Sequence, residues 1–502
     1  MNNKPMLNAY PDSMGGTLGD IAEILSREEL RDLFGSFYIL PSLYHSDLDR
    51  GFSVIDYDLN EELATEEDLA AIRDLGIGLK LDFILNHASA QSPQFKDLVE
   101  KGEESEYKDF FINWNKFWEG HGTMTEEGYI EPDPESLKKM FFRKPGLPLL
   151  MVQFPDGSRV PYWNTFYQEV DYPNYKGQMD LNIKSPKVWD FYRDTLRKLA
   201  DYGAEIVRLD AFAYAPKEPG EKNFLNEPGT WDFLADVQKE ADPYSLSLLP
   251  EIHAAYNEKI YKKLAEKGYV TYDFFLPGLI LDAIESKRSR YLADWAREIL
   301  DDHLQVVNML GCHDGIPLLD LKGLLPEEDI QKLIDLLVSR GGLVKDLHGQ
   351  KNMYYQVNAA YFSALGASEK KMLMARAIQL FMPGKPQIWY LDLFAGENDL
   401  EAVRRAGESG HKEINRTNLT RADIEAALQK PVVRKQLELI RLRTQSRAFS
   451  EGANVTVENT EHTIRFIWEY QGSRAELYVD FEKEEYSISS YDSAYEGKEG
   501  AV

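Results

Sequence analysis

The chain has 502 residues, of which 43% are hydrophobic and 12% aromatic, which is enough for a large core in one big domain with additions. Lysine and arginine number 57 against 84 aspartates and glutamates, and the formal net charge is −27. A field of this sign disfavours binding to nucleic acid and to anionic membranes. The single cysteine, Cys312, excludes an internal disulfide.

No targeting or membrane-spanning signal is visible. The first residues lack the apolar run of a signal peptide, and no stretch of about 18 apolar residues predicts a membrane span. The histidines lack close ligand spacing such as His-x-x-x-His. We therefore expect a cytoplasmic protein with no metal and no cofactor.

Short apolar runs alternate with helical patterns along most of the chain. Such alternation implies parallel pairing, and eight strand–helix units predict a closed (β/α)8 barrel. Helices are expected between most strands, for example over Pro186–Tyr202 and Asn257–Lys267. The strands are expected near Met6–Tyr10, Ser36–Pro41, Leu79–Leu85, Glu205–Asp210, Leu246–Glu251, Val270–Phe274, Gln305–Leu310 and Gln387–Leu391.

Two insertions interrupt this repeat. The first runs from about Ser89 to Met179 and is rich in aromatic residues, glycine and proline. The second runs from about Gly315 to Tyr354 and includes a helix-like stretch, Pro326–Arg340. Both leave the C-terminal ends of strands, where barrel enzymes build their active sites, so they should form the walls and roof of a site.

The pattern changes again after about Pro431. Alternating runs such as Thr463–Tyr470 and Ala475–Phe481 predict antiparallel strands of a small β domain. We therefore divide the chain into a barrel at residues 1–88, 180–314 and 355–431, an insertion domain B at 89–179, a second insertion B′ at 315–354, and a C-terminal β domain at 432–502.

The run Glu205–Ala211 has the pattern of a short buried strand that ends on an arginine and a carboxylate. A period of two places Arg208 and Asp210 on the same side of that strand. A cation beside a carboxylate lowers its pKa and keeps it ionised at neutral pH. Because a covalent glycosyl nucleophile must be ionised, Asp210 is a candidate for that role.

Three further strand ends carry polar motifs that would meet the first at one mouth of the barrel. Taken singly, each has a structural explanation, such as a capped turn or one half of an ion pair. Burying several like charges together costs free energy, however, and function is the usual reason to retain them. The four motifs are Asp82-Phe-Ile-Leu-Asn86-His87, Arg208-Leu-Asp210, Leu249-Pro250-Glu251-Ile252-His253 and Gly311-Cys312-His313-Asp314-Gly315.

In this order the four motifs resemble the signature regions of the α-amylase superfamily, glycoside hydrolase family 13. The resemblance extends over nearly the whole chain. Within the family, the chain most specifically resembles the sucrose phosphorylase subfamily. The strings that carry it are Asp49-Arg-Gly-Phe52, Lys101-Gly-Glu-Glu-Ser-Glu-Tyr107, His313-Asp-Gly-Ile-Pro317, Tyr355-Gln-Val-Asn358, Tyr361-Phe-Ser-Ala-Leu365, Ala395-Gly-Glu-Asn-Asp399 and Ile414-Asn-Arg416.

The resemblance implies roles for these residues. Asp210 would be the nucleophile, Glu251 the general acid/base, and Asp314 would steady an oxocarbenium-like transition state. A retaining mechanism needs one ionised and one protonated carboxyl beside the same bond. Arg208 would lower the pKa of Asp210, and desolvation in an apolar strand would raise that of Glu251. The glucosyl-binding residues would be Asp49, Phe52, His87, Arg208, His313 and Arg416.

In the sucrose phosphorylase subfamily, phosphate rather than water resolves the glucosyl-enzyme and gives α-glucose 1-phosphate with retained configuration. This step needs cationic or hydrogen-bonding groups at the acceptor site. Arg143 and Lys144 stand in a Pro-Gly-Leu-Pro context that matches the family, and a solvated basic pair is the alternative explanation. The acceptor candidates are Arg143, Lys144, Tyr214, His253, Lys345, His348, Tyr355 and Gln356.

Four departures from the subfamily, all expected to lie away from the glucosyl-binding core, put the acceptor in question, and two of them are charged segments. The string before Ile414-Asn-Arg416 usually carries an arginine, where this chain has Lys412, and a lysine cannot copy the planar fork of arginine. The loop Gly341–Lys351 is short and charged. Its Lys345, His348 and Lys351 would suit a second phosphate, as in relatives that act on sucrose 6'-phosphate; a solvent-exposed charged loop is the alternative.

The sequence therefore predicts a retaining α-glucoside phosphorylase of the sucrose phosphorylase type. Its leaving group is open among fructose, fructose 6-phosphate, glycerol and glycerate. A retaining α-glucosidase or transglucosidase shares every catalytic residue and differs only in the acceptor. An inactive carbohydrate-binding barrel is disfavoured, because Asp210, Glu251 and Asp314 are all present. The expected partners are an α-glucoside, inorganic phosphate and, as in relatives, a second copy of the chain.

Overall fold

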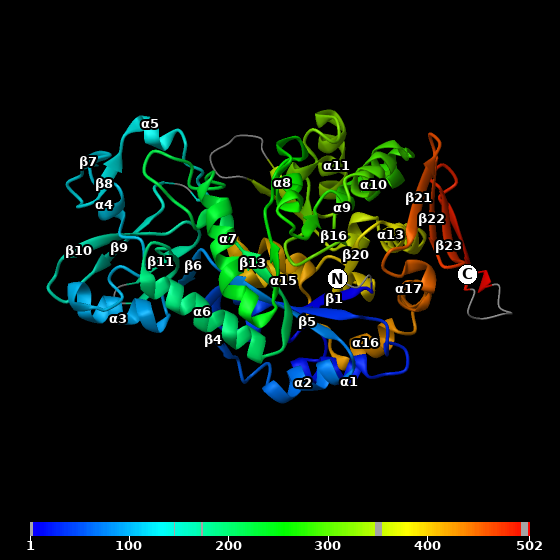
Figure 1. Cartoon of the computed structure of the whole chain (residues 1–502), viewed down its shortest axis with the longest axis horizontal. Coiled ribbons are helices and arrows are strands. Elements are labelled where there is room, and N and C mark those ends of the chain that lie inside the picture. Colours follow the sequence, from blue (N-terminus) through cyan, green and yellow to red (C-terminus); the bar gives the residue numbers. More distant parts are fainter. Residues whose placement is uncertain (1–3, 145, 172–173, 347–353, 493–499, 502) are drawn as a thin grey trace.

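The computed structural model describes residues 4–144, 146–171, 174–346, 354–492 and 500–501. Its centre is a parallel eight-stranded sheet in the order β14-β13-β5-β2-β1-β20-β16-β15 (Figure 1). Each strand pairs with its neighbour along the chain, and the two edge strands are also consecutive, so the sheet curls into a nearly closed barrel. The strands are β1 (Met6–Ala9), β2 (Ser36–Ile39), β5 (Gly78–Ile84), β13 (Ala204–Asp210), β14 (Ser247–Pro250), β15 (Thr271–Asp273), β16 (Val306–Met309) and β20 (Lys385–Trp389).

The predicted barrel is confirmed, and each predicted strand overlaps an observed one. All residues of β1, β2, β16 and β20 are buried, as expected for strands with a filled interior on one face and helices on the other. The register places Asp82 of β5 directly beside Arg208 of β13, and Arg208 beside Leu249 of β14. This register brings the polar ends of three strands to one mouth.

The outer layer is helical. In α6 (Pro186–Asp201) a proline occupies the first turn, and a stripe of five residues from Val188 to Leu199 is buried, as predicted for Pro186–Tyr202. The helix predicted over Asn257–Lys267 is shorter, because Lys259 has φ of 54° and separates a 3-10 turn from α8 (Ile260–Glu266). The other barrel helices are α1 (Leu18–Leu25), α2 (Glu66–Asp74), α7 (Gly229–Ala241), α9 (Leu276–Ser286), α10 (Arg290–Asp301), α12 (Tyr361–Ala364), α13 (Glu369–Phe381), α14 (Tyr390–Leu393), α15 (Leu400–Ala406) and α16 (Arg421–Ala427).

The first insertion builds a lobe of short strands and helices at one end of the molecule (Figure 1). This lobe has a core of its own, made of Ile112, Trp114, Trp118, Ile130, Met140 and Trp163. The indole nitrogen of Trp114 donates to the carbonyl of Ile130 at 2.7 Å. The elements are β6 (His87–Ser89), α3 (Pro93–Lys101), α4 (Trp114–Phe117), β7 (Gly122–Met124), β8 (Ile130–Pro132), α5 (Pro134–Leu137), β9 (Leu149–Gln153), β10 (Arg159–Trp163), β11 (Gln168–Asp171) and β12 (Asn174–Asp180).

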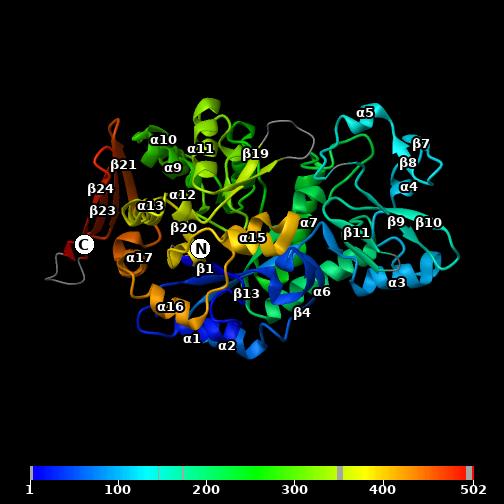
Figure 2. The ribbon, with the colours of Figure 1, turned by 180° about the vertical axis from the view of Figure 1, so that it is seen from behind.

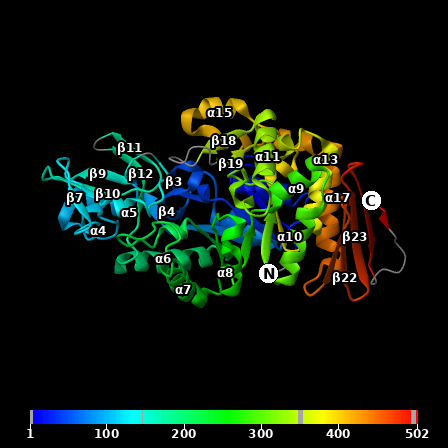
Figure 3. The same ribbon diagram turned by 90° about the horizontal axis from the view of Figure 1, so that it is seen from above.

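The second insertion forms a three-stranded sheet next to a helix. The sheet order is β17 (Ile316–Pro317), β19 (Tyr354–Asn358) and β18 (Leu343–Asp346). The helix is α11 (Glu327–Ser339), which matches the predicted Pro326–Arg340. Seen from above, β18, β19 and α15 lie on one side of the barrel (Figure 3). A further hairpin, β3 (Tyr44–Leu48) with β4 (Ser53–Leu59), carries the Asp49–Phe52 segment at its turn.

The C-terminal segment begins with α17 (Pro431–Gln445) and continues as an antiparallel sheet. This sheet lies at the end of the molecule opposite the first insertion (Figures 1 and 2). The indole nitrogen of Trp468 donates to the carbonyl of Phe381 on α13 at 2.8 Å, so the sheet is fixed to the barrel layer. Its strands are β21 (Asn454–Asn459), β22 (Thr463–Tyr470), β23 (Ser473–Asp480), β24 (Glu485–Tyr491) and β25 (Gly500–Ala501).

Within the part of the chain that the structure describes, none of the helices combines the length and the apolar character needed to cross a bilayer.

Candidate active site

Arg208 lies among three carboxyl groups at the mouth of the barrel. Its Nη1 donates to Asp82 Oδ1 at 2.6 Å and to Asp210 Oδ1 at 3.0 Å. Its Nη2 lies 2.6 Å from Glu251 Oε1. The side chains of Asp210 and Glu251 are each 13% exposed, against 3% for Arg208. The structure therefore brings the predicted nucleophile and the predicted acid/base onto one guanidinium.

The pKa shifts of this pair run opposite to the sequence-based expectation. Burial raises the pKa of Glu251, but Arg208 and His253 outweigh it and hold this pKa at about 2. Burial also raises the pKa of Asp210 well above its usual range, because the nearby negative charges of Glu251 and Asp82 offset Arg208. The reason is geometric: the arginine fork approaches Glu251 at 2.6 Å and Asp210 at 3.0 Å.

Asp314 follows β16 and faces two cations and the neutral ring of His313. Lys412 Nζ lies 2.7 Å from Asp314 Oδ1 and 3.2 Å from Asp49 Oδ2. Arg416 Nη2 lies 3.9 Å from the same Asp314 oxygen, and His313 Nε2 lies 3.3 Å from Oδ2. Although burial raises the pKa of Asp314, these neighbours hold it well below its usual range. Lys412 was not among the predicted site residues; the signal was its position four residues before Arg416, where the family carries an arginine.

The predicted glucosyl-binding residues contact one another around Asp314. The ring of Phe52 stacks on His313, with centroids 5.0 Å apart and an angle of 12°. His87 Nε2 lies 2.9 Å from the carbonyl oxygen of Phe52. Arg416 Nε donates to the carbonyl of His313 at 2.9 Å, and Arg416 Nη1 lies 3.5 Å from Asp49 Oδ1. The strand ends and the β3–β4 turn therefore form one continuous surface.

Several buried polar atoms at this surface have no hydrogen-bond partner among the described residues. They include Nη2 of Arg416, the hydroxyl of Tyr10 and both ring nitrogens of His313, whose Nε2 approaches Asp314 at 3.3 Å without the geometry of a hydrogen bond. His87 and His313 are both predicted to bind the glucosyl group. Burial lowers the pKa of each imidazole, that of His313 to about 3, so both rings are neutral. Buried polar groups normally find partners, so a concentration of unpaired ones fits a polar ligand such as a sugar.

The acceptor candidates that the structure describes lie on different sides of the mouth. Arg143 lies 5.6 Å over the ring of Phe166. Burial raises the pKa of Tyr214, and the charge and hydrogen bond of Arg143 offset only part of this rise. Gln356 Nε2 donates to the carbonyl of Asp314 at 2.5 Å. His253 Nε2 lies 3.5 Å from Glu251 Oε1. These contacts place Arg143 and Tyr214 together, and His253 and Gln356 beside the predicted catalytic carboxyls.

Lys144, another acceptor candidate, makes its side-chain contact with Asn164. Its Nζ donates to the side-chain oxygen of Asn164, and burial lowers its pKa to about 8. Lys144 is thus a buried lysine bound to Asn164 rather than a freely solvated one. His348 and the side chains of Lys345 and Tyr355 lie outside the described residues.

Lys217 is a buried cation that sequence reasoning missed. Its Nζ lies 2.8 Å from Asp180 Oδ2 and donates to Asn86 Oδ1 at 2.9 Å. The Thr165 hydroxyl donates to the same Asp180 oxygen at 2.6 Å. Because Asp180 ends β12 and Asn86 follows β5, this cluster joins the first insertion to the barrel beside His87. No sequence motif indicates that Lys217 is buried, because a single lysine after a helical turn usually faces solvent.

The comparisons with known proteins agree with this geometry. A profile described as the catalytic domain of alpha amylase matches residues 8–311. A sucrose 6(F)-phosphate phosphorylase from Ilumatobacter coccineus is 54% identical over 500 residues, which cover 97% of this chain and 95% of the relative. The chain belongs to the sucrose phosphorylase group of the α-amylase family.

Two further family members illustrate the range of this group. A sucrose phosphorylase from Streptococcus mutans is 35% identical over 468 residues, covering 92% of each chain. The crystal structure of sucrose 6F-phosphate phosphorylase from Thermoanaerobacter thermosaccharolyticum superposes with a TM-score of 0.91 at 33% identity, covering 100% of this chain and 98% of that one. The fold and its insertions are therefore those of the phosphorylase group over the full length.

Proposed function

We propose that this protein is a glycoside phosphorylase that cleaves sucrose 6F-phosphate with inorganic phosphate. The products are α-glucose 1-phosphate and fructose 6-phosphate. The observation that carries the choice of substrate is the 54% identity, over nearly the whole of both chains, to a protein named for this reaction. This assignment narrows the leaving group, which the sequence alone left open, to fructose 6-phosphate.

The site geometry supports a double displacement. In the first step a carboxylate oxygen of Asp210 forms a bond to the anomeric carbon, the glycosidic bond breaks, and Glu251 gives its proton to the departing oxygen. In the second step a phosphate oxygen forms the bond to the anomeric carbon and displaces Asp210, while Glu251 takes the proton of the phosphate. Two inversions at one carbon retain the α configuration.

The first step needs the proton on Glu251, whereas the structure favours it on Asp210. Substrate binding supplies the reversal. Positive charge developing at the anomeric carbon favours an ionised Asp210, and a glycosidic oxygen that accepts a hydrogen bond favours a protonated Glu251. Because both carboxyls contact Arg208, the guanidinium can turn toward Asp210 as Glu251 is protonated.

Cationic residues at the mouth suit phosphorylated substrates in a protein whose net charge is −27. Arg143, which lies over Phe166 and near Tyr214, and His253, which lies beside Glu251, are the cations that we assign to the acceptor side. Arginine suits bidentate phosphate contacts. We assign the glucosyl hydroxyls to Asp49, His87, His313, Asp314 and Arg416, with Phe52 packing against the ring.

The test is acceptor-dependent release of phosphate from α-glucose 1-phosphate. Purified protein would be incubated with this donor and with fructose 6-phosphate, fructose, glycerol or glycerate in turn, with Asp210→Asn as the inactive control. We expect kcat/KM for fructose 6-phosphate to exceed that for fructose by at least about tenfold, the effect of one additional charge-assisted contact. Preference for fructose would overturn the 6-phosphate assignment, and release with water alone would indicate a hydrolase.

A further inference from the structure

Asp320, His253 and Glu251 form a row of three polar side chains that ends at the proposed acid/base, Glu251. Asp320 lies in a 3-10 helix, η7 (Leu319–Leu321), and its side chain is 2% exposed. Its Oδ1 lies 3.3 Å from Nδ1 of His253, and Nε2 of the same ring lies 3.5 Å from Oε1 of Glu251. Each ring nitrogen of His253 therefore faces one carboxyl group.

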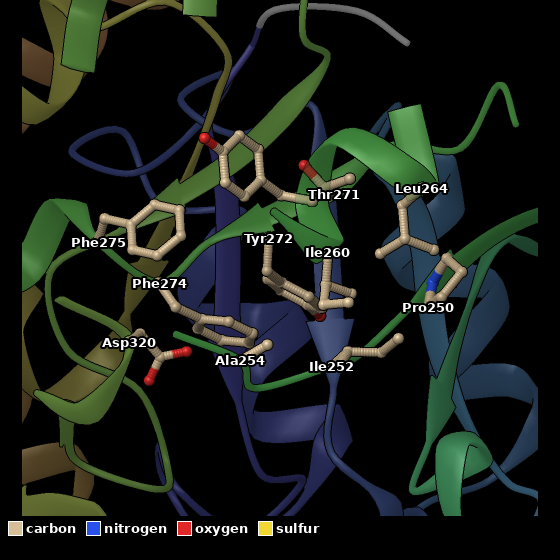
Figure 4. A pocket seen from close by; sticks show the side chains of 11 residues that line it. Pro250, Ile252, Ala254, Ile260, Leu264, Thr271, Tyr272, Phe274, Phe275 and Asp320 are labelled. Atoms are coloured by element: carbon tan, nitrogen blue, oxygen red, sulfur yellow. The ribbon is translucent and has the colours of Figure 1, made fainter. Parts of the chain in front are cut away.

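The ring of His253 is held in this position by packing. Phe274 stacks on it with centroids 3.9 Å apart and an angle of 23°. Figure 4 shows Asp320 beside the Phe274 ring, at the edge of a small cavity of about 20 Å³ that apolar side chains largely line. Such a volume holds about one water molecule. A carboxylate in this apolar setting is costly unless a cation compensates it, and the ion pair that Asp320 makes is with His253.

The charges around His253 favour an imidazolium. Glu251 faces it from its own segment and Asp320 from η7, while Phe274 after β15 contributes no charge. Burial alone would lower the pKa of His253, but the two carboxyls raise it to about 10. Since this pKa lies above the ordinary value, the positive charge is present at neutral pH and is lost only as the pH rises through about 10.

We propose that Asp320 is a positioning residue for phosphate: it holds His253 so that Nε2–H points at Glu251 and at the incoming phosphate. The inference rests on the proposed function. In the second displacement a phosphate oxygen bonds to the anomeric carbon, the bond to Asp210 breaks with its electron pair returning to the carboxylate, and the phosphate proton passes to Glu251. A fixed cation beside Glu251 attracts the anionic acceptor, whereas neutral water gains nothing from it.

The substitution Asp320→Asn tests this role because it keeps the shape of the side chain and removes its charge. We expect the KM for phosphate to rise about tenfold or more. The KM for the glucosyl donor and the slow transfer of glucose to water should change less than about threefold, since neither needs the cation. In protein with 13C-labelled histidine, the NMR titration of His253 should move down by about 1–3 pH units.

His253→Gln is the matched control. It identifies the His253 signal, and Asp320→Asn added to it should have no further effect on the KM for phosphate, because Asp320 acts through the ring. Equal losses with phosphate and with water as acceptors, or effects of the two substitutions that add, would overturn the proposal.

The titration of the unsubstituted protein separates this inference from the proposed function. A His253 pKa at or below the ordinary value of about 6.5 would refute the role of Asp320 even if phosphorolysis is confirmed, or if Asp320→Asn does not fold. Conversely, a raised pKa in a protein that does not use phosphate would refute the proposed function and leave only the ion pair.

Discussion

Replacing Lys412 by methionine removes the nearest cation of Asp314 and leaves the hydrophobic stem in place. Lys412 Nζ lies 2.7 Å from Asp314 and 3.2 Å from Asp49. Both partners keep Arg416, at 3.9 Å and 3.5 Å. The loss is therefore that of one charge-assisted hydrogen bond rather than of an isolated buried pair, about 1.5–3 kcal/mol. At 1.36 kcal/mol per decade, this corresponds to about a 10- to 150-fold fall in kcat/KM.

The assay for Lys412→Met is single-turnover glucosylation with α-glucosyl fluoride, which needs no proton from Glu251 and reports on the glucosyl subsite alone. Lys412→Arg, which keeps the charge, is the control and should retain at least about a tenth of the activity. If the methionine variant stays within about threefold of the unsubstituted protein, Lys412 is only a structural contact and the reasoning fails. If Lys412→Arg lowers the glucosylation rate as much as Lys412→Met does, the shape of the side chain rather than its charge determines the rate.

Three other substitutions test separate parts of the site. Asp210→Asn should lower phosphorolysis at least about 10⁴-fold in initial-rate assays. Glu251→Gln should lower kcat/KM on sucrose 6F-phosphate about 10²–10⁴-fold but spare α-glucosyl fluoride, so equal losses on both donors would remove its role as acid. Lys217→Met leaves Asp180 unpaired and should cost about 3–5 kcal/mol, seen as a Tm lower by several degrees. The control Lys184→Met breaks an exposed pair with Glu218 and should shift Tm by about 1 °C or less; equal shifts would contradict the role of the buried pair.

Strand positions were predictable because each barrel strand is a short apolar run bounded by polar residues. The last predicted strand shows where such predictions fail. Gln387–Leu391 was expected as a strand, but β20 ends at Trp389 and residues from Tyr390 form a helical turn. A continuously apolar stretch has no period by which a strand can be told from a buried helix. The C-terminal segment differs for another reason: α17, in which Val433, Leu437 and Ile440 are buried at helical spacing, precedes the alternating β pattern that defined this segment.

The contacts among the predicted catalytic carboxyls followed from the strand order, but the directions of their pKa shifts did not. The spacing of Arg208 and Asp210 along one strand suggested that the arginine serves Asp210. The structure adds Glu251 from the next strand, and Arg208 approaches it at 2.6 Å. A sequence shows neighbours within a strand, whereas a pKa depends on all charges within a few ångströms, including those from other strands. Lys217 and Asp180, distant in sequence and paired at 2.8 Å, were missed for the same reason.

The distribution of cations at the mouth itself argues for the identity of the nucleophile. Glu251 has Arg208 at 2.6 Å and Asp314 has Lys412 at 2.7 Å, whereas the nearest cation of Asp210 is the shared Arg208 at 3.0 Å. Asp210 is therefore the least compensated of the three carboxyls. The counter-charge that an ionised Asp210 lacks is what a glucosyl oxocarbenium ion brings, so the transition state stabilises the ionised form that the free protein disfavours. A carboxyl already paired with its own cation would gain less, which favours Asp210 over Asp314 as the residue that bonds to the sugar.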